Sequence, residues 1–197
     1  MPIKAVIFDL DGTITQPYFD FDAIREEIGL ARDSGPLLES MEKMNLQLRR
    51  KAEKILFIHE QKAVIESKLN PGAEQTLSEL RAAGIHIGIL TRNKRSNAYA
   101  IAKKHKLKFD AVIGREDGPV KPDVFGVIEL CRQFGVKPQE TLLVGDYLFD
   151  LLCAKAAGVG AVLLANHSQA GEFVKHADFS IENLSGILEI IANNNCR

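Results

Sequence analysis

The sequence predicts an α/β fold built on a mainly parallel sheet, with a helical segment inserted after the first strand. From residue 71 onward, short apolar β-type segments alternate with longer segments of helical period, as in a parallel sheet covered by helices. The region from 16 to 70 breaks this alternation because it contains no convincing strand. With 197 residues and 46% hydrophobic content, the chain is large enough for one compact domain and a modest appendage.

The sheet is expected to contain five strands. They are Lys4–Asp9, Ile85–Thr91, Ala111–Gly114, Thr141–Gly145 and Gly160–Leu164. Helical segments lie between these strands. Proline marks the start of a segment and glycine follows its end, which is the order that helices favour. These boundary residues are Pro71, Gly84, Pro122, Gly135 and Gly158.

Residues 16–70 form a segment of their own. The pattern predicts a helix, a turn at 33–36 (Asp-Ser-Gly-Pro), and a second long helical stretch. We interpret it as a small module whose chain leaves and re-enters the sheet domain, which gives a core of 1–15 and 71–197 and an inserted segment of 16–70. The alternative is two ordinary helices packed on the sheet.

Charge and composition exclude several classes of protein. Lys and Arg total 25 against 26 Asp and Glu, so the net charge of -1 gives no electrostatic reason to expect nucleic acid or an anionic membrane as partner. The apolar runs Ala5–Phe8 and Ala156–Ala165 are too short for a signal peptide core or a membrane span. Cys131, Cys153 and Cys196 are widely spaced, which favours reduced thiols in a cytoplasmic protein. The sequence does not indicate an oligomeric state.

The strongest local signal is the segment Asp9-Leu10-Asp11-Gly12-Thr13, directly after the first strand. Ligands of open parallel sheets bind at the carboxyl ends of the strands. Two neighbouring carboxylates repel each other unless a cation or a shared proton relieves them, and Mg²⁺ prefers oxygen ligands of this kind. Gly12 permits a sharp exit from the strand. Taken alone, this pattern is also found in common loops and calcium-type turns.

The segment Thr91-Arg92-Asn93 follows the second strand. It offers a hydroxyl, a guanidinium and backbone N–H groups at a helix start, all of which suit an anion. A plain helix N-cap would use the same residue types.

Two further segments follow later strands. Lys121-Pro122 lies in a proline-stiffened loop that would direct one ammonium group, although a single loop lysine is also commonly solvated. Asp146 and Asp150 lie four residues apart after the fourth strand, which would place two acids on one helical face. Helix capping would explain Asp146, but Asp150 less readily.

In order, the strand ends supply an acid pair, a hydroxyl, a lysine and a second acid pair, which is the outline of a phosphoryl-transfer site. The sequence resembles the haloacid dehalogenase-like hydrolase superfamily, whose pattern matches at Asp9–Thr13, Thr91, Lys121 and Asp146–Asp150. The segment 16–70 lies where capped members carry their first cap, as in the branch with phosphoglycolate phosphatases and β-phosphoglucomutases. The resemblance implies a Rossmann-like, three-layer parallel sheet core with a small α-helical cap after the first strand.

The resemblance also implies an activity. It indicates a magnesium-dependent phosphatase that acts on a small phosphorylated metabolite through an aspartyl-phosphate intermediate. Asp9 would be the nucleophile and a magnesium ligand, and Asp11 the general acid and base, lending its backbone carbonyl to the metal. Asp146 would ligate magnesium, with Asp150 supporting it. A carboxylate nucleophile beside an acid that changes protonation role is what a two-step hydrolysis requires.

The same resemblance assigns Thr91 and Lys121 to the phosphoryl oxygens, with Arg92 and Asn93 as further candidates for phosphate binding. Arg92 stands where many members have a small residue or Asn, so it would either contact substrate or be a surface charge. The inserted segment is short, so the substrate contacts of larger relatives do not transfer to it. We expect it to act as a mobile lid that limits the enzyme to small phosphates.

A phosphomutase is the main alternative, and three other interpretations fit the sequence less well. A phosphomutase would use the same residues. A dehalogenase would have a non-acidic residue at the position of Asp11. A response-regulator receiver domain would carry its phosphorylated Asp on a later strand and would lack the insertion. A scaffold protein would keep the fold for binding phosphate without turnover.

Overall fold

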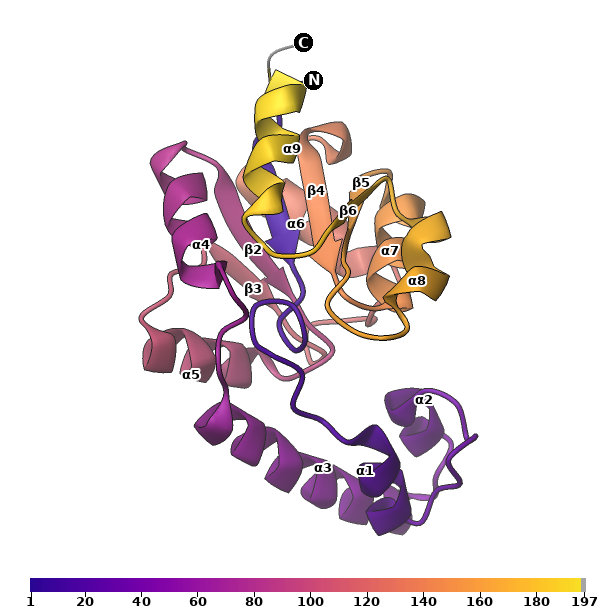
Figure 1. Ribbon diagram of the computed structural model, residues 1–197. Coiled ribbons are helices and arrows are strands. Elements are labelled where there is room, and N and C mark those ends of the chain that lie inside the picture. Colours follow the sequence, from indigo (N-terminus) through magenta and orange to yellow (C-terminus); the bar gives the residue numbers. More distant parts are fainter. Residues whose placement is uncertain (196–197) are drawn as a thin grey trace. The chain divides into compact units, whose positions relative to one another are not determined.

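The computed structural model describes residues 1–195, so Cys196 lies outside the described residues. A six-stranded sheet has the strand order β3-β2-β1-β4-β5-β6, and every neighbouring pair is parallel (Figure 1). The strands are β1 (Ala5–Phe8), β2 (His86–Leu90), β3 (Ala111–Ile113), β4 (Thr141–Gly145), β5 (Gly160–Leu164) and β6 (Phe179–Ile181). The predicted α/β class is therefore confirmed.

The five predicted strands are present, and β6 was missed. This strand is three residues long, and of its residues only Ile181 is buried. A run this short with one core residue shows no alternation that a sequence pattern could detect.

Helices cover both faces of the sheet. One face carries α6 (Phe125–Phe134), α7 (Leu148–Ala157) and α8 (Ala170–Phe173), and the other carries α4 (Ala73–Ala82) and α9 (Gly186–Asn195) (Figure 1). The remaining helices of this part of the chain are α5 (Arg95–His105), which contacts β3, and the short 3-10 turns η1 (Pro138–Glu140) and η2 (Val174–His176). This is the predicted three-layer arrangement.

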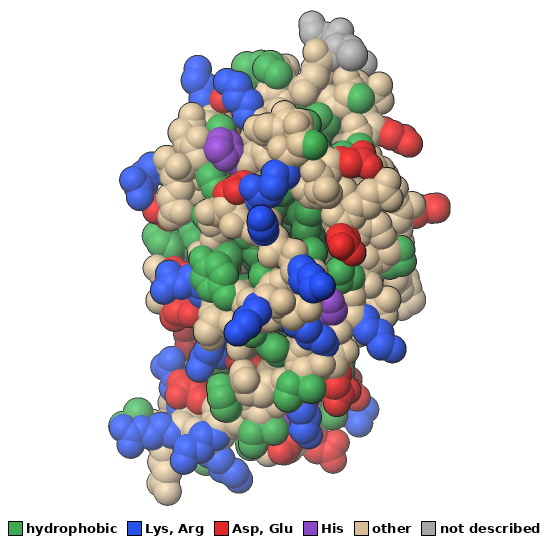
Figure 2. All heavy atoms as spheres, turned by 90° about the vertical axis from the view of Figure 1, so that its left-hand side faces the viewer, with side chains coloured by type: hydrophobic (Ala, Val, Ile, Leu, Met, Phe, Trp, Pro, Cys, Tyr) green, Lys and Arg blue, Asp and Glu red, His purple; other side chains and the backbone are tan. Residues whose placement is uncertain are grey.

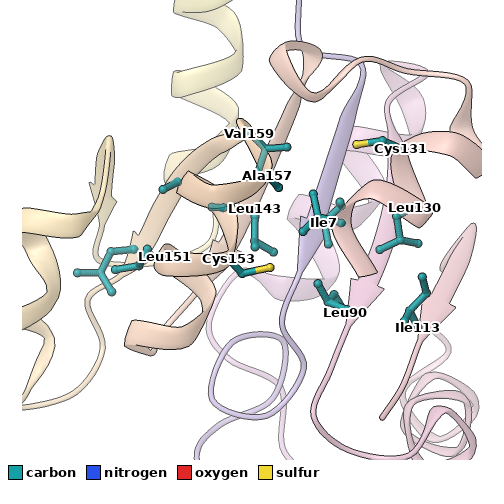
Figure 3. Close-up of a cluster of buried hydrophobic side chains, with 14 of the residues drawn as sticks. Ile7, Leu90, Ile113, Leu130, Cys131, Leu143, Leu151, Cys153, Ala157 and Val159 are labelled. Carbon is teal, nitrogen blue, oxygen red and sulfur yellow. The ribbon is translucent and has the colours of Figure 1, made fainter. Parts of the chain in front are cut away.

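A large part of the core lies between the sheet and the helices α6 and α7 (Figure 3). Ile7, Leu90 and Leu143 point into it from three adjacent strands, and Leu130 and Leu151 meet them from the two helices. Because both faces of the sheet are covered, the central strands are apolar at almost every position.

Two of the three cysteines lie in the same core. Cys131 and Cys153 are buried free thiols, on α6 and α7. Burial raises the pKa of Cys153 to about 12, so this thiol stays protonated and acts as a packing group.

The chain divides into two compact units. The larger contains residues 1–17 and the chain from 68 onward, and the smaller is Tyr18–Ser67. The smaller unit contains α1 (Phe21–Ile28), α2 (Leu37–Glu42) and α3 (Leu46–Glu66). Its own apolar cluster consists of Ile24, Leu37, Met41, Ala52 and Leu56.

The second long helical stretch expected in the smaller unit is two helices. The break falls at 43–45, where the Asn45 side chain accepts a hydrogen bond from the N–H of Leu48 and begins α3. An N-cap of this kind starts a new helix because it satisfies a donor that the preceding turn leaves open.

The larger unit holds the two connections to the insertion side by side. The N–H of Gln16 donates to the carbonyl of Lys68 at 2.8 Å, and the N–H of Asn70 donates to the carbonyl of Ile14 at 3.0 Å. An antiparallel bridge between Thr15 and Leu69 lies between these bonds. The chain therefore leaves and re-enters the sheet domain at one place.

The face shown in Figure 2 carries Lys and Arg, Asp and Glu, and apolar side chains. This mixture agrees with a formal net charge of -1. Across residues 1–195, no helix combines the length and the apolar character that crossing a membrane would require.

Candidate active site

Three carboxylates meet at the carboxyl edge of the sheet. Asp9 follows β1, and Asp146 and Asp150 follow β4. Each offers one oxygen to a cluster in which all of these atoms lie within 4.8 Å of one another. The strand-end argument therefore placed these three residues in one site. The Asp11 carboxylate is not part of this cluster.

A single ammonium group joins two of the carboxylates. Lys121 Nζ lies 2.6 Å from Asp9 Oδ1 and 2.6 Å from Asp150 Oδ1. Lys121 is only 3% exposed, so it is a buried component of the site and not a solvated loop residue. Its peptide bond to Pro122 is cis.

The cluster carries excess negative charge. Burial raises the pKa of Asp9 to about 7, with Asp150 and Asp146 adding to the effect and Lys121 opposing it. Burial likewise raises the pKa of Asp146 to about 7, again with a contribution from Asp150. Burial alone would lower the pKa of Lys121, but Asp150 and Asp9 outweigh it and raise that pKa above its ordinary value.

The donor set fits a magnesium ion. Three carboxylates against one ammonium leave a formal charge of -2 when all are ionised. The buried Asp150 Oδ1 contacts the Lys121 ammonium at 2.6 Å, so Asp150 and Asp9 share one positive charge. Oxygen ligands with unrelieved charge are what a hard divalent cation binds.

The two acids after β4 are arranged differently from the expectation. Asp146 lies in the turn before α7, whereas Asp150 is the third residue of that helix, so the two do not share a helical face. Asp150 is also the capping residue, because its Oδ2 accepts the N–H of Tyr147 at 3.1 Å. The helix begins later than expected because the chain is still turning at 145–147.

Asp11 is held by an amide. Asn93 Nδ2 donates to Asp11 Oδ2 at 3.1 Å. The Asn93 Oδ1 accepts from Asn97 Nδ2 at 2.8 Å and from the N–H of Lys94 at 2.7 Å, which fixes the Nδ2 side toward Asp11. Asp11 is partly exposed, so it is oriented and accessible at once.

Three backbone N–H groups after β2 already donate to acceptors within the protein. The N–H of Asn93 donates to Thr91 Oγ1 at 3.0 Å, that of Lys94 is bound by Asn93, and that of Arg95 donates to the Glu116 carboxylate at 3.0 Å. Of the predicted segment Thr91-Arg92-Asn93, the N–H of Asn93 is therefore engaged, whereas the N–H groups of Lys94 and Arg95 belong to the residues just after it. The Thr91 hydroxyl accepts one bond and keeps its proton for donation.

Arg92 contacts the loop that carries Lys121 and the first turn of α7. Its Nη1 donates to the backbone carbonyl of Lys121, and its guanidinium carbon lies 4.9 Å from the centre of the Phe149 ring. It is partly buried, so it is more than a plain surface charge.

Known proteins share this chain's sequence and fold. A model of the haloacid dehalogenase-like hydrolase family matches residues 3–158. An uncharacterized hydrolase of Saccharomyces cerevisiae is 32% identical over 202 residues, which cover 98% of this chain and 93% of the yeast protein. The chain belongs to the haloacid dehalogenase-like hydrolase family.

Two other relatives lie in the branch that the sequence resembles. A phosphoglycolate phosphatase of Nitrosospira multiformis is 28% identical over 184 residues, covering 80% of this chain and 81% of that protein. The crystal structure of a β-phosphoglucomutase from Clostridium difficile has a TM-score of 0.77 at 20% identity, covering 99% of this chain and 100% of that one. The second comparison shows that the fold is shared.

This hydrolase also has site residues that the sequence analysis missed. Asn70 Nδ2 donates to the carbonyls of Gly12 at 2.8 Å and of Thr13 at 2.7 Å, and Asn166 Nδ2 donates to the Gly12 carbonyl at 2.8 Å. Asn70 belongs to the return connection of the insertion. These amides hold the backbone of the turn that carries Asp11.

Asp146 is held by two residues that were likewise not assigned. Thr13 Oγ1 donates to Asp146 Oδ1 at 2.9 Å. His167 Nδ1 accepts the N–H of Gln169, so its Nε2 carries the proton and donates to the Asp146 carbonyl at 2.6 Å. Asn166 and His167 follow a predicted strand, so the strand-end rule applied to β5 would have found them.

Proposed function

We propose that this hydrolase is a magnesium-dependent phosphomonoesterase that acts on small phosphorylated metabolites through an aspartyl-phosphate on Asp9. The observation that carries the proposal is the buried contact of 2.6 Å between Lys121 Nζ and Asp9 Oδ1, inside a cluster of three carboxylates. A nucleophilic carboxylate, a fixed positive charge and a cation site in one place are the components that phosphoryl transfer requires.

Magnesium would be held by Asp9, Asp146 and Asp150, together with the backbone carbonyl of Asp11. When bound, the ion draws negative charge from the phosphoryl oxygens and relieves the repulsion within the cluster. The chain's own residues support this assignment, because Thr13 and His167 hold Asp146 at its carboxylate and at its carbonyl.

The protein side of the chemistry follows from the contacts. Lys121 holds the Asp9 carboxylate in one orientation and offsets the charge that develops on the phosphoryl group. Asp11, oriented by Asn93, gives a proton to the leaving group and then takes one from the attacking water. The Thr91 hydroxyl, which accepts the N–H of Asn93, would donate its proton to a phosphoryl oxygen.

The substrate class rests on the relatives. One relative is named phosphoglycolate phosphatase and is 28% identical over most of both chains. A phosphomutase would use the same residues and pass the phosphoryl group to a second substrate hydroxyl. We favour water as acceptor because the likeness to the mutase structure, at 20% identity, concerns the fold alone.

The test is hydrolysis of p-nitrophenyl phosphate with magnesium and with a chelator. We expect turnover only with magnesium, and neither turnover nor phosphoenzyme in Asp9→Asn, because an amide is not a competent nucleophile. Asp11→Asn keeps the nucleophile and should be slowed by roughly 10²–10⁴-fold. Asp117→Asn, outside the carboxylate cluster, is the matched control and should keep parental activity. A phosphoenzyme mapped to Asp11, or activity in Asp9→Asn within a few-fold of the parent, would refute the assignment.

A further inference from the structure

Two loops of the site and the first turn of α7 meet at one arginine. Arg92 comes from the loop after β2, Lys121 from the loop between β3 and α6, and Phe149 from the segment between Asp146 and Asp150. Arg92 donates to the Lys121 carbonyl and lies over the Phe149 ring. We propose that Arg92 and Phe149 form a clamp that positions Lys121 for catalysis, an inference that rests on the proposed function of the site.

The geometry of the clamp suits an arginine. A guanidinium over an aromatic ring, within about 6 Å of its centre, is attracted by the ring's negative face. The N–H donors of a guanidinium lie in its own plane. The group can therefore lie flat on the Phe149 ring and still donate to a carbonyl at its edge. A lysine has no planar group and cannot make both contacts in this way.

The ring is itself held in place. Phe149 packs edge to face against Tyr147 with ring centres 5.3 Å apart, and Tyr147 packs in the same way against Phe173 at 5.2 Å. Phe173 is buried in the core beside α7. The clamp is therefore linked to the hydrophobic core at Phe173 through the half-exposed ring of Tyr147.

Lys121 needs such an anchor because its ammonium has two partners to satisfy. Nζ lies 2.6 Å from both Asp9 Oδ1 and Asp150 Oδ1, at the end of a flexible four-carbon chain. A shift of the Lys121 backbone would move Nζ away from one carboxylate or both. Arg92 holds the carbonyl directly attached to the Lys121 Cα, so it restrains the point from which the side chain starts.

The clamp and direct substrate contact predict different kinetics. A positioning residue acts through Lys121, so its loss lowers kcat for every phosphate ester by a similar factor. A residue that binds the substrate raises KM, most for esters that carry a second anionic group. The clamp also predicts that Arg92 has nothing further to contribute once the Lys121 side chain is absent.

The experiment is a double-mutant cycle in the full chain with magnesium, using p-nitrophenyl phosphate and an ester with a second anionic group. We expect Arg92→Ala to lower kcat roughly ten- to a hundredfold, the cost of a misplaced catalytic group. The same change in a Lys121→Ala background should then change kcat less than twofold. Phe149→Leu should show a smaller loss that is not additive with Arg92→Ala. Full additivity in the cycle, or a raised KM with unchanged kcat, would overturn the clamp.

Two substitutions separate the clamp from a general charge effect. Arg92→Lys keeps the positive charge and should fall toward the alanine variant, whereas parental activity in it would count against the clamp. Arg95→Ala removes an arginine three positions along, whose side chain pairs with Asp117 at 2.8 Å. We expect it to keep the parental kcat, and a loss equal to that of Arg92→Ala would refute the proposal.

A measurement without turnover distinguishes failure of the clamp from failure of the proposed function. Lys121 is buried, so acetylation by acetic anhydride, mapped by mass spectrometry, should be slow in the parent and severalfold faster in Arg92→Ala and Phe149→Leu. Lys4, which is exposed, serves as the internal reference. Unchanged Lys121 acetylation in both variants refutes the clamp even in an active phosphatase. An inactive parent refutes the proposed function while the acetylation result still decides the clamp.

Discussion

Replacing Lys121 by Met should destabilise the metal-free protein strongly. The substitution nearly preserves the volume of the side chain but removes the charge that contacts Asp9 and Asp150 at 2.6 Å each. Removing one partner of a buried ion pair leaves an uncompensated charge and costs about 3–5 kcal/mol of unfolding free energy. We expect a loss of that size at pH 8.

The loss should be smaller at pH 5. In the folded metal-free protein the pKa of Asp9 is about 7, above the ordinary value of 3.8. The folded state binds the Asp9 proton more tightly than the unfolded state does. Protonation of Asp9 therefore adds to the free energy of unfolding in full below pH 3.8, and this contribution is lost as the pH rises through 7. At pH 5 Asp9 is largely protonated in parent and variant alike, so the missing ammonium matters less. At pH 8 the variant must either hold the ionised carboxylates without the ammonium or bind a proton that the parent does not, because Lys121 lowers the pKa of Asp9.

The assay is urea unfolding at pH 5 and pH 8, with chelator and with magnesium. Magnesium should recover part of the deficit at pH 8, because the cation relieves the same carboxylates. Lys4→Met is the matched control: Lys4, whose side chain is exposed, pairs with Glu140 at 2.7 Å, and because solvent reaches this ammonium its loss should cost about 1 kcal/mol or less. A deficit in Lys121→Met below about 1 kcal/mol, or one equal at the two pH values, would refute this account of the cluster.

Three other outcomes follow from the site. Asp146→Ala should raise the magnesium concentration for half-maximal rate by at least roughly tenfold, and an unchanged magnesium titration would remove Asp146 from the metal site. Gly12→Ala should lower kcat roughly hundredfold. The φ of 95° at Gly12 is strained for alanine, and an alanine Cβ would lie 2.3 Å from the Asp146 carboxylate. A near-parental kcat would contradict this. Replacing residues 18–67 by a short Gly/Ser linker should leave a folded core, because Gln16 and Lys68 on either side are hydrogen bonded to each other. The replacement should lower kcat/KM for small esters more than kcat/KM for a phosphoprotein. Full efficiency on small esters would refute the predicted lid.

The strand-end rule explains why so much of the site was predictable. Parallel strands deliver the residues that follow them to one edge, so Asp9, Thr91, Asp146 and Asp150 were placed together from the order of apolar runs alone. Lys121 was harder, because a loop separates it from the end of β3 at Ile113. Only the family pattern distinguished it from a solvated lysine, and its burial then agreed with that assignment.

The residues that hold the site were not predictable in the same way. Asn70 and Asn166 act on backbone carbonyls of the turn after β1, and a carbonyl is present at every position of a sequence. His167 likewise bonds the carbonyl of Asp146. A pattern of side chains can indicate which groups do chemistry, but it does not record which carbonyl a distant amide reaches. Asn166 and His167 follow β5, so the strand-end rule would have placed them at this edge, but the carbonyls that they bond became visible only with the fold.

The two motif glycines show why acid pairs so far apart in sequence belong together. A Cβ on Gly12 would lie 2.3 Å from the Asp146 carboxylate, and a Cβ on Gly145 would lie 2.2 Å from that of Asp150. Each carboxylate therefore occupies the space that a side chain at the glycine would fill. Gly12 is needed because the Asp146 carboxylate lies against it. Thr13 joins the same two segments by donating a hydrogen bond to Asp146. The segments after β1 and β4 thus fit each other as one unit, and a change in either is expected to disturb the carboxylates of both.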